Sequence, residues 1–326
     1  MSFFFYKGAS QGVFKIKKTM KPTITIIMAT YYRAHLIVET LHSIQQQTFA
    51  DWECLIIDDG GTDNTSEVIA PILEKDSRFQ FLKRPETYLK GLPGCRNYGL
   101  DLAQGAFVIF FDDDDVIHPD NLKISLDFLQ KQNVAFCHYQ KQTFETEVPH
   151  FTFGEPNVMQ ALNSTHLYDI ITHQIGLASC TVLWDKKCFE TIRFKEELQY
   201  AEEWECYTRI LSEGFEGIMI DAILYYNRKH PNSNTGEFFS HNPIRKKSNY
   251  DAILLVIANL KEKQLLTDLI LRYFIQVALD YKEYQLFSAI LETAQLSVFE
   301  KIKRRLFYFI LPLRLYLYGF KKKLFS

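Results

Sequence analysis

The chain has 326 residues, is 47% hydrophobic and carries a formal net charge of −2. This composition suits a globular protein with a substantial core, excludes a disordered chain, and gives no reason to expect a nucleic-acid partner. Six widely spaced cysteines without a C-x-x-C pair argue against a disulfide framework or a zinc site and favour a reducing compartment. No apolar run reaches the length of about 18 residues that a membrane-spanning helix needs.

From residue 21 onward, apolar runs and helical patterns alternate at intervals of about 30 to 40 residues. Strands are expected over 23–28, 52–57, 79–82 and 107–111, and helices over 36–47, 65–73 and 96–104. This alternation predicts an α/β fold with a mostly parallel, Rossmann-like sheet, right-handed crossovers and helices on both faces.

The second half of the chain has a different pattern. A helix is expected after Pro119, further strands over 134–139, 176–184 and 218–226, and a helix over 201–211, whereas residues 140–165 read as irregular. Long helical patterns dominate from Asn249 onward. We therefore expect an N-terminal extension (1–20), an α/β domain (21–240) and a helical C-terminal region (241–326). The aromatic and basic residues of 1–20 stand in the wrong order for a secretory signal.

Two of the expected strands end in acidic residues. Phe107–Phe111 runs directly into four carboxylates, Asp112 to Asp115, and the strand over 52–57 is followed by Asp58 and Asp59. Parallel strands end at the same edge of a sheet, where open α/β folds bind ligands, so both acidic segments are expected there. Four adjacent carboxylates repel one another, and a divalent cation would relieve this repulsion. The alternative is a solvated acidic turn before the helix that follows Pro119.

Six short motifs follow one another between about residues 23 and 235. They are TYYR (30–33), QTFADWE (47–53), DDGGTD (58–63), RNYG (96–99), FDDDDVIHP (111–119) and EEW (202–204). In this order and spacing they resemble the motifs of the family-2 glycosyltransferases, which have the GT-A fold. Tyr32 stands where that family has Asn, Gly61 where it has Ser, and Glu203 where it has Asp.

The resemblance implies an inverting enzyme that moves a sugar from a nucleoside-diphosphate sugar to a hydroxyl of a glycan or lipid-linked glycan. Asp59 would bind the nucleobase, Asp112 would face the ribose, and Asp114 with His230 would hold Mg²⁺ or Mn²⁺. Glu203 would be the general base, with Glu202 as its neighbouring competitor. The residues implied for the nucleotide-sugar site are Thr30, Tyr31, Arg33, Asp59, Arg96, Asp112 and Asp113.

Two other functions compete with this interpretation. A sugar-nucleotide nucleotidylyltransferase also has a parallel sheet and an acidic metal site, but it carries a Gly- and Arg-rich loop where this chain has residues 29–33. A non-catalytic protein that keeps the fold and binds nucleotide sugars or glycans would explain the exchange of the usual Asp for Glu203.

The C-terminal end combines basic and apolar residues. Basic residues at 301–305 and 321–323 flank an aromatic-rich apolar segment, 306–318, that is too short to span a bilayer. This pattern predicts docking on an anionic membrane surface, with the protein cytoplasmic and peripheral to the membrane. The alternative is a last helix packed on the α/β domain, with its lysines in water.

Overall fold

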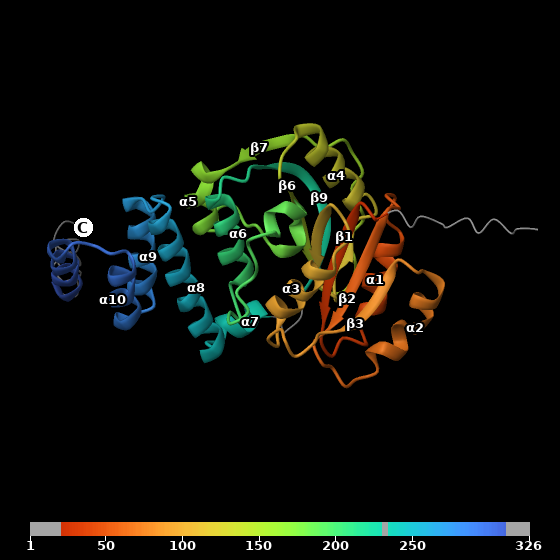
Figure 1. Ribbon diagram of the computed structural model, residues 1–326, viewed down its shortest axis with the longest axis horizontal. Helices are drawn as coiled ribbons and strands as arrows, with labels where there is room; N and C mark the ends of the chain where they lie inside the picture. Colours follow the sequence, from red (N-terminus) through yellow and green to blue (C-terminus); the bar gives the residue numbers. More distant parts are fainter. Residues whose placement is uncertain (1–20, 230–233, 311–326) are drawn as a thin grey trace, which may run out of the picture.

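The computed structural model describes residues 21–229 and 234–310 (Figure 1). The expected extension 1–20 and the segment 311–326 lie outside the described residues. Within the described chain, one nine-stranded sheet has the order β3-β2-β1-β4-β8-β6-β9-β5, and β7 pairs with β9. The mostly parallel α/β fold predicted from the sequence is confirmed.

The first half of the sheet is parallel. The register pairs Thr30 with Asp58 and Met28 with Phe111, so these strands end close together. The loops that carry the acidic motifs therefore leave the sheet at a single edge. The strands are β1 (Ile24–Thr30), β2 (Trp52–Asp58), β3 (Phe79–Lys83) and β4 (Phe107–Phe111).

Helices cover both faces of this half. In β1, Ile24, Ile26 and Met28 belong to one hydrophobic cluster and Ile27 to another, as the alternation of side chains along a strand requires. The first cluster is completed by α1 (Ile37–Gln45), α2 (Thr65–Lys75) and α4 (Asn121–Gln132). The second is completed by α3 (Leu92–Leu102), α5 (Leu167–Ile171) and α6 (Glu202–Ser212).

The second half of the sheet is mixed. β8 lies antiparallel between β4 and β6, β6 and β9 are parallel, and β5 and β7 pair with β9 in antiparallel fashion. The strands are β5 (Val116–Ile117), β6 (Phe136–Phe144), β7 (Val158–Leu162), β8 (Val182–Asp185) and β9 (Gly217–Arg228). Short 3₁₀ turns occur at Ser164–His166, Ser179–Thr181 and Lys186–Phe189.

Three local predictions differ from the structure. Residues 140–165, expected to be irregular, contain the end of β6 and all of β7. The strand expected over 176–184 is limited to β8, because a 3₁₀ turn precedes it. Helix α3 begins at Leu92 instead of residue 96, because Pro93 fits the first helical turn, where its missing N–H is not needed.

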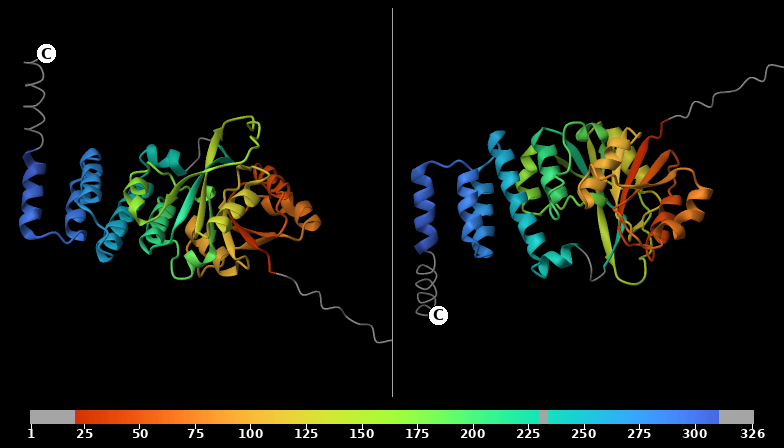
Figure 2. Two further views of the ribbon diagram at one scale, coloured as in Figure 1. Left: turned by 90° about the horizontal axis from the view of Figure 1, so that it is seen from above. Right: turned by 60° about the horizontal axis from the view of Figure 1, so that its bottom comes forward.

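The C-terminal helices form a row that extends away from the sheet (Figures 1 and 2). Buried residues of α8, α9 and α10 extend the hydrophobic cluster that contains α6 and β4: α8 packs on α6, and α10 packs on α8 and α9. The division of the chain at residue 240 stays a prediction. Among the described residues, no helix is both long and apolar enough to cross a bilayer. The helices are α7 (Asn234–Phe239), α8 (Pro243–Glu262), α9 (Asp268–Asp280), α10 (Tyr284–Thr293) and the helical residues 298–310.

Candidate active site

A cleft of about 1780 Å³ opens at the edge of the sheet where β1, β2 and β4 end. Its walls also include residues of α3, α6, α7 and α9. His230 lies outside the described residues, so its role stays a prediction. All the other residues that the sequence assigns to the site line this cleft, namely Thr30, Tyr31, Arg33, Asp59, Arg96, Asp112, Asp113, Asp114 and Glu203.

The four consecutive aspartates after β4 have different environments. Asp112 lines the cleft beside Arg96, and its N–H donates to the hydroxyl of Tyr225 at 3.1 Å. Burial raises the pKa of Asp112; Arg96 opposes this shift, and the charge of Asp114 adds to it. Asp115 faces inward and accepts a hydrogen bond of 2.7 Å from the N–H of Arg228. Burial, with the charges of Asp112 and Asp114, raises the pKa of Asp115 to about 7.

Arg33 compensates part of this negative charge. Its Nε lies 3.4 Å from Oδ1 of Asp113 and 3.6 Å from Oδ2 of Asp114. Burial raises the pKa of Asp113 to about 8 with the help of Asp114, although the Thr30 hydroxyl and Arg33 act in the opposite direction. An acidic cluster with raised pKa values is short of positive charge, and carboxylate oxygens are the ligands that Mg²⁺ and Mn²⁺ prefer.

The described residues contain no group of three or more His, Cys, Asp or Glu side chains that could hold a metal ion. Asp112, Asp113 and Asp114 line the cleft, whereas Asp115 is turned into the protein. The three carboxylates in the cleft are the residues that would contribute ligands to a divalent cation bound there.

Asp59 is held in place by two donors. Arg84, the residue after β3, donates from Nε to Oδ1 of Asp59 at 2.6 Å, and the N–H of Gly91 donates to the same oxygen at 3.2 Å. Asp59 also donates its own N–H to the carbonyl of Thr30, which ties the loop after β2 to the end of β1. Gly91, the residue before helix α3, has φ of 127°, a conformation that favours glycine.

A cation and an aromatic ring meet at the cleft wall near Asp59. Lys90 donates from Nζ to the hydroxyl of Tyr31 at 3.0 Å, and the same Nζ lies 4.3 Å from the centroid of that ring. Lys90 and Arg84 were not among the residues assigned from the sequence. Arg84 could have been found from the rule that neighbouring parallel strands end together. In the structure Asp58 pairs with Lys83, and this brings the next residues, Asp59 and Arg84, together.

Arg96 of α3 forms the buried centre of the opposite wall. Its Nη1 donates to Oε1 of Glu202 at 3.0 Å, its Nη2 donates to the Ser179 hydroxyl at 3.0 Å, and Nη2 lies 3.9 Å from Oδ1 of Asp112. Burial lowers the pKa of Arg96, but Glu202, Glu203 and Asp112 raise it by more. Arg96 therefore remains charged and links the acidic strand end to the start of α6.

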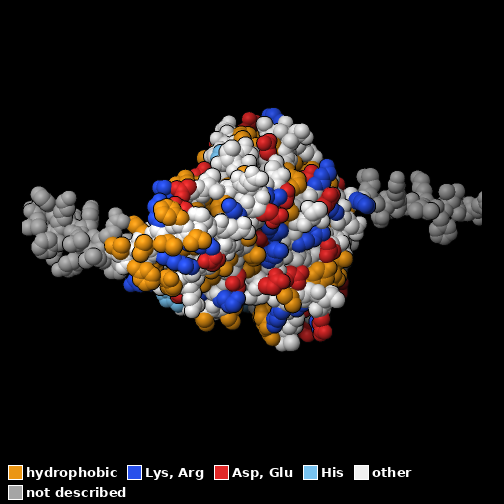
Figure 3. All heavy atoms as spheres, turned by 60° about the vertical axis from the view of Figure 1, so that its left-hand side comes forward, with side chains coloured by type: hydrophobic (Ala, Val, Ile, Leu, Met, Phe, Trp, Pro, Cys, Tyr) orange, Lys and Arg blue, Asp and Glu red, His pale blue; other side chains and the backbone are white. Residues whose placement is uncertain are grey.

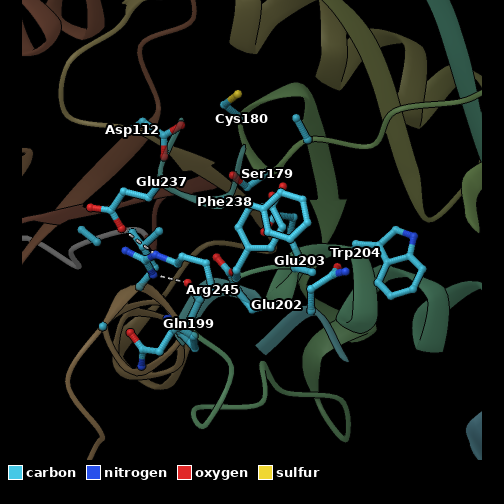
Figure 4. Close-up of a pocket in the computed structure, with 18 of the residues that line it drawn as sticks. Asp112, Ser179, Cys180, Gln199, Glu202, Glu203, Trp204, Glu237, Phe238 and Arg245 are labelled. Carbon is cyan, nitrogen blue, oxygen red and sulfur yellow. Dashed lines mark hydrogen bonds and ion pairs between the residues drawn. The ribbon is translucent and has the colours of Figure 1, made fainter. Parts of the chain in front are cut away.

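The two adjacent glutamates of α6 differ in their surroundings. Glu202 is buried and paired with Arg96, and burial, followed by the charge of Glu203, raises its pKa to about 8. Glu203 is half-buried and lines the cleft (Figure 4). Ala201 precedes the helix with φ of 62°, so the backbone turns sharply immediately before both residues.

Several residues around Glu203 were not assigned to the site from the sequence. Burial, then Glu203 and Tyr281, raises the pKa of Tyr200 to about 12, and His173 also interacts electrostatically with Glu203. Lys141 lines the cleft beyond an irregularity in the pairing of β6 with β9, and bulges of this kind redirect side chains. Cys180 contributes most to a raised pKa of Lys141; burial opposes the rise, and the charges of Asp112, Asp115 and Glu203 add to it.

Beyond Glu203 the cleft is lined by aromatic side chains. The rings of Tyr200 and Phe238 stack with centroids 4.5 Å apart and an interplanar angle of 9°. Arg245 fixes this wall by pairing with Glu237 at 2.9 Å and by donating to the carbonyl of Gln199 (Figure 4). The aromatic residues that line this part are Tyr200, Trp204, Phe238, Phe239, Tyr273, Phe274 and Tyr281.

Comparison with known sequences gives a family match. The model of the family described as Glycosyl transferase family 2 matches residues 25–182. The Escherichia coli protein WfgD, named UDP-Glc:alpha-D-GlcNAc-diphosphoundecaprenol beta-1,3-glucosyltransferase, is 27% identical over 190 residues, which cover 58% of this chain and 70% of that protein. An uncharacterized glycosyltransferase of Rickettsia conorii is 28% identical over 60% of this chain, which spans only 31% of that relative's length.

Comparison with solved structures supports the same fold. TarS residues 1–349 from S. aureus, crystallised in complex with UDP, superpose with a TM-score of 0.62 at 21% sequence identity. The superposition covers 83% of this chain and 80% of the TarS 1–349 chain. The structural similarity shows the GT-A fold, and the family match over residues 25–182, with the motifs around the cleft, supports a glycosyltransferase of family 2.

Proposed function

We propose that the protein is an inverting glycosyltransferase that moves a sugar from a nucleoside-diphosphate sugar to a hydroxyl group of a lipid-linked glycan. One observation carries this proposal: a single cleft contains both the acidic strand end, Asp112 to Asp114, and the accessible carboxylate of Glu203. The acidic strand end would bind the diphosphate end of the donor through a cation. The Glu203 carboxylate would accept a proton from the acceptor hydroxyl that attacks the donor.

The donor is proposed to bind where β1 and β2 end. Asp59, oriented by Arg84 and the N–H of Gly91, is positioned to accept a hydrogen bond from a nucleobase. Tyr31, held by Lys90, offers a ring face beside it, and Asp112, which lines the same cleft, is proposed to bind the ribose. Thr30, Arg33, Arg96 and Asp113 complete this half of the cleft.

Asp114 is proposed to hold Mg²⁺ or Mn²⁺ together with the donor's diphosphate. The cation would supply positive charge that stabilises the leaving diphosphate. Arg33 sits against Asp113 and Asp114, so it would limit the repulsion among these carboxylates before the donor binds.

Glu203 is the proposed general base. It would accept the proton of the acceptor hydroxyl while that oxygen attacks the anomeric carbon from the face opposite the diphosphate. The bond from the anomeric carbon to the diphosphate oxygen breaks as the new glycosidic bond forms, which inverts the configuration. Glu202 is less suited to this role, because its carboxylate is buried against Arg96.

The acceptor is proposed to bind in the aromatic part of the cleft beyond Glu203. Aromatic rings provide apolar faces for sugar rings, and tyrosine hydroxyls provide hydrogen-bonding groups. The E. coli relative is named for a diphosphoundecaprenol-linked acceptor, which supports a lipid-linked glycan and a site of action at a membrane surface.

A panel of nucleotide sugars tests the proposal. Purified protein is incubated with UDP-, GDP- and dTDP-sugars and Mn²⁺, and release of the nucleoside diphosphate is measured with and without an undecaprenyl-diphosphate-linked sugar. We expect slow release with one donor alone and faster release when an acceptor is added. Donor binding without release under any condition would instead favour a non-catalytic nucleotide-sugar-binding protein.

A further inference from the structure

The helical residues 298–310 have two faces of opposite character. The inner face packs on α10, where the ring of Tyr308 stacks on Phe287 with centroids 4.8 Å apart. The same face forms ion pairs with the protein: Arg304 with Asp268 at 3.0 Å, and both Lys301 and Arg305 with Glu292. These contacts fix the rotation of the helix about its axis.

The outer face is apolar and exposed. Its six side chains lie at positions that share one side of a helix with 3.6 residues per turn. Their exposed fractions run from 46% to 74%, although they include some of the largest hydrophobic side chains. Figure 3 shows hydrophobic side chains gathered over this end of the molecule. We call this surface the apolar stripe, and it consists of Val298, Phe299, Ile302, Leu306, Phe309 and Ile310.

This arrangement differs from the one expected from the sequence. Docking on anionic lipid was predicted from basic residues at 301–305 and 321–323. The second group lies outside the described residues, and in the first group Lys301, Arg304 and Arg305 are paired with carboxylates of the protein itself. Lys303 is the most exposed of the four, at 66%, and its ion pair is with Glu300 on its own helix. The surface that residues 298–310 turn outward is therefore mainly apolar.

We propose that the apolar stripe enters the interfacial region of a lipid bilayer and holds the protein there mainly by apolar burial. The helix would lie along the membrane surface, with the stripe in the bilayer and the ion-paired face on the protein. The choice of a lipid bilayer as the partner rests on the proposed function, because a lipid-linked acceptor is available at a membrane surface.

Two observations favour a membrane over a second copy of the chain. The sequence beyond the described residues, 311–326, continues with leucines and aromatic residues among Arg314 and Lys321 to Lys323, a composition that suits a lipid interface. The stripe is also a narrow line of aromatic and aliphatic residues flanked by an exposed cation, Lys303, whereas stable subunit interfaces bury broad surfaces.

Flotation with liposomes tests the proposal on the full chain. Vesicles of phosphatidylcholine alone, and of phosphatidylcholine with phosphatidylglycerol, are mixed with wild type and with the variant Phe299→Ser/Ile302→Ser/Leu306→Ser. We expect wild type to float with both kinds of vesicle, and the stripe variant to bind at least about tenfold more weakly to both, because three large apolar side chains are lost. The matched control Val158→Ser/Met159→Ser changes exposed apolar residues on β7 and should float like wild type.

A second variant separates apolar from electrostatic docking. Lys301→Gln/Arg304→Gln/Arg305→Gln removes the cations of the inner face and should change flotation by less than about threefold, because exposed ion pairs contribute little and these do not face the bilayer. Melting temperature and circular dichroism establish that each variant is folded. Donor hydrolysis, measured without vesicles, should be the same in the stripe variant and wild type, so failure of docking is distinguishable from failure of the proposed function.

Two results would overturn the proposal. In one, the stripe variant floats as well as wild type while the inner-face variant does not, which would assign docking to the basic residues. In the other, wild type does not float and light scattering detects a dimer that the stripe variant dissociates, which would make the stripe an interface between copies of this chain.

Discussion

Arg96 and Glu202 form a buried ion pair, with 3.0 Å between Nη1 and Oε1, at the start of helix α6. Because of this pair, two adjacent glutamates have different surroundings. The Glu202 carboxylate contacts Arg96, whereas the next carboxylate, Glu203, lines the cleft. Arg96 in turn lies 3.9 Å from Asp112, so the same guanidinium connects Glu202, the residue before the proposed base, to the proposed donor site.

The first prediction concerns the pH dependence that Glu202 gives to stability. Burial and Glu203 raise its pKa from 4.5 to about 8 in the folded protein, although Arg96 acts in the opposite direction, so the Arg96–Glu202 pair is fully charged only above about pH 8. The stability contributed by the protonated form is fully present below about 4.5, falls as pH rises between 4.5 and 8, and is lost above 8. Thermal unfolding should therefore show the wild type losing stability relative to Glu202→Gln across this range. A pH-independent difference between the two melting temperatures would contradict the raised pKa.

The second prediction concerns the metal. Asp114→Ala removes a proposed ligand of Mg²⁺ or Mn²⁺, so the affinity for the nucleotide donor measured with Mn²⁺ should fall by at least about tenfold. The melting temperature without metal should be unchanged or higher, because one of four neighbouring like charges is lost.

Asp127→Ala is the control for this variant, since Asp127 is exposed on α4 and lies outside the cleft. Isothermal titration with UDP or GDP, with and without Mn²⁺, measures the effect. Equal metal-dependent binding by Asp114→Ala and wild type would place the metal ligands elsewhere.

The third prediction concerns the aromatic part of the cleft. Tyr281→Ala removes a ring that lines this part, near Tyr200. The acceptor KM should rise by about two- to tenfold, the usual contribution of one aromatic contact, with no change in donor hydrolysis. Leu269→Ala, an exposed site on α9 outside the cleft, should change neither quantity. An equal effect on donor hydrolysis would show that Tyr281 acts on the donor side instead.

Local sequence patterns were sufficient for the first half of the site. The apolar runs fix β1, β2 and β4, and the residues after each run, Thr30, Asp59 and Asp112, come to one edge because parallel strands end together. Tyr32 stands where the family has Asn, and it adopts φ of 57°, which asparagine tolerates better than most residues. The hydroxyl of Tyr32 is hydrogen-bonded to Thr62.

The residues that the sequence did not predict depend on contacts between distant segments. Lys141 reaches the cleft because β6 pairs with β9 through an irregular register, and Tyr281 reaches it because α9 packs in the row of C-terminal helices. The inward direction of Lys301 and Arg304 depends on Glu292 and Asp268, two carboxylates on other helices. A pattern within one segment carries no information on such partners.

The central claim is that Glu203 is the general base of glycosyl transfer, and paired glutamine variants test it most directly. Transfer from the donor found in the nucleotide-sugar panel to an undecaprenyl-diphosphate-linked acceptor is measured for Glu203→Gln and Glu202→Gln, alongside donor affinity. We predict that Glu203→Gln binds the donor like wild type and loses transfer by about a hundredfold or more, the usual contribution of a general base, and by much more than Glu202→Gln does. A large loss in Glu202→Gln combined with near-normal transfer in Glu203→Gln would contradict the assignment.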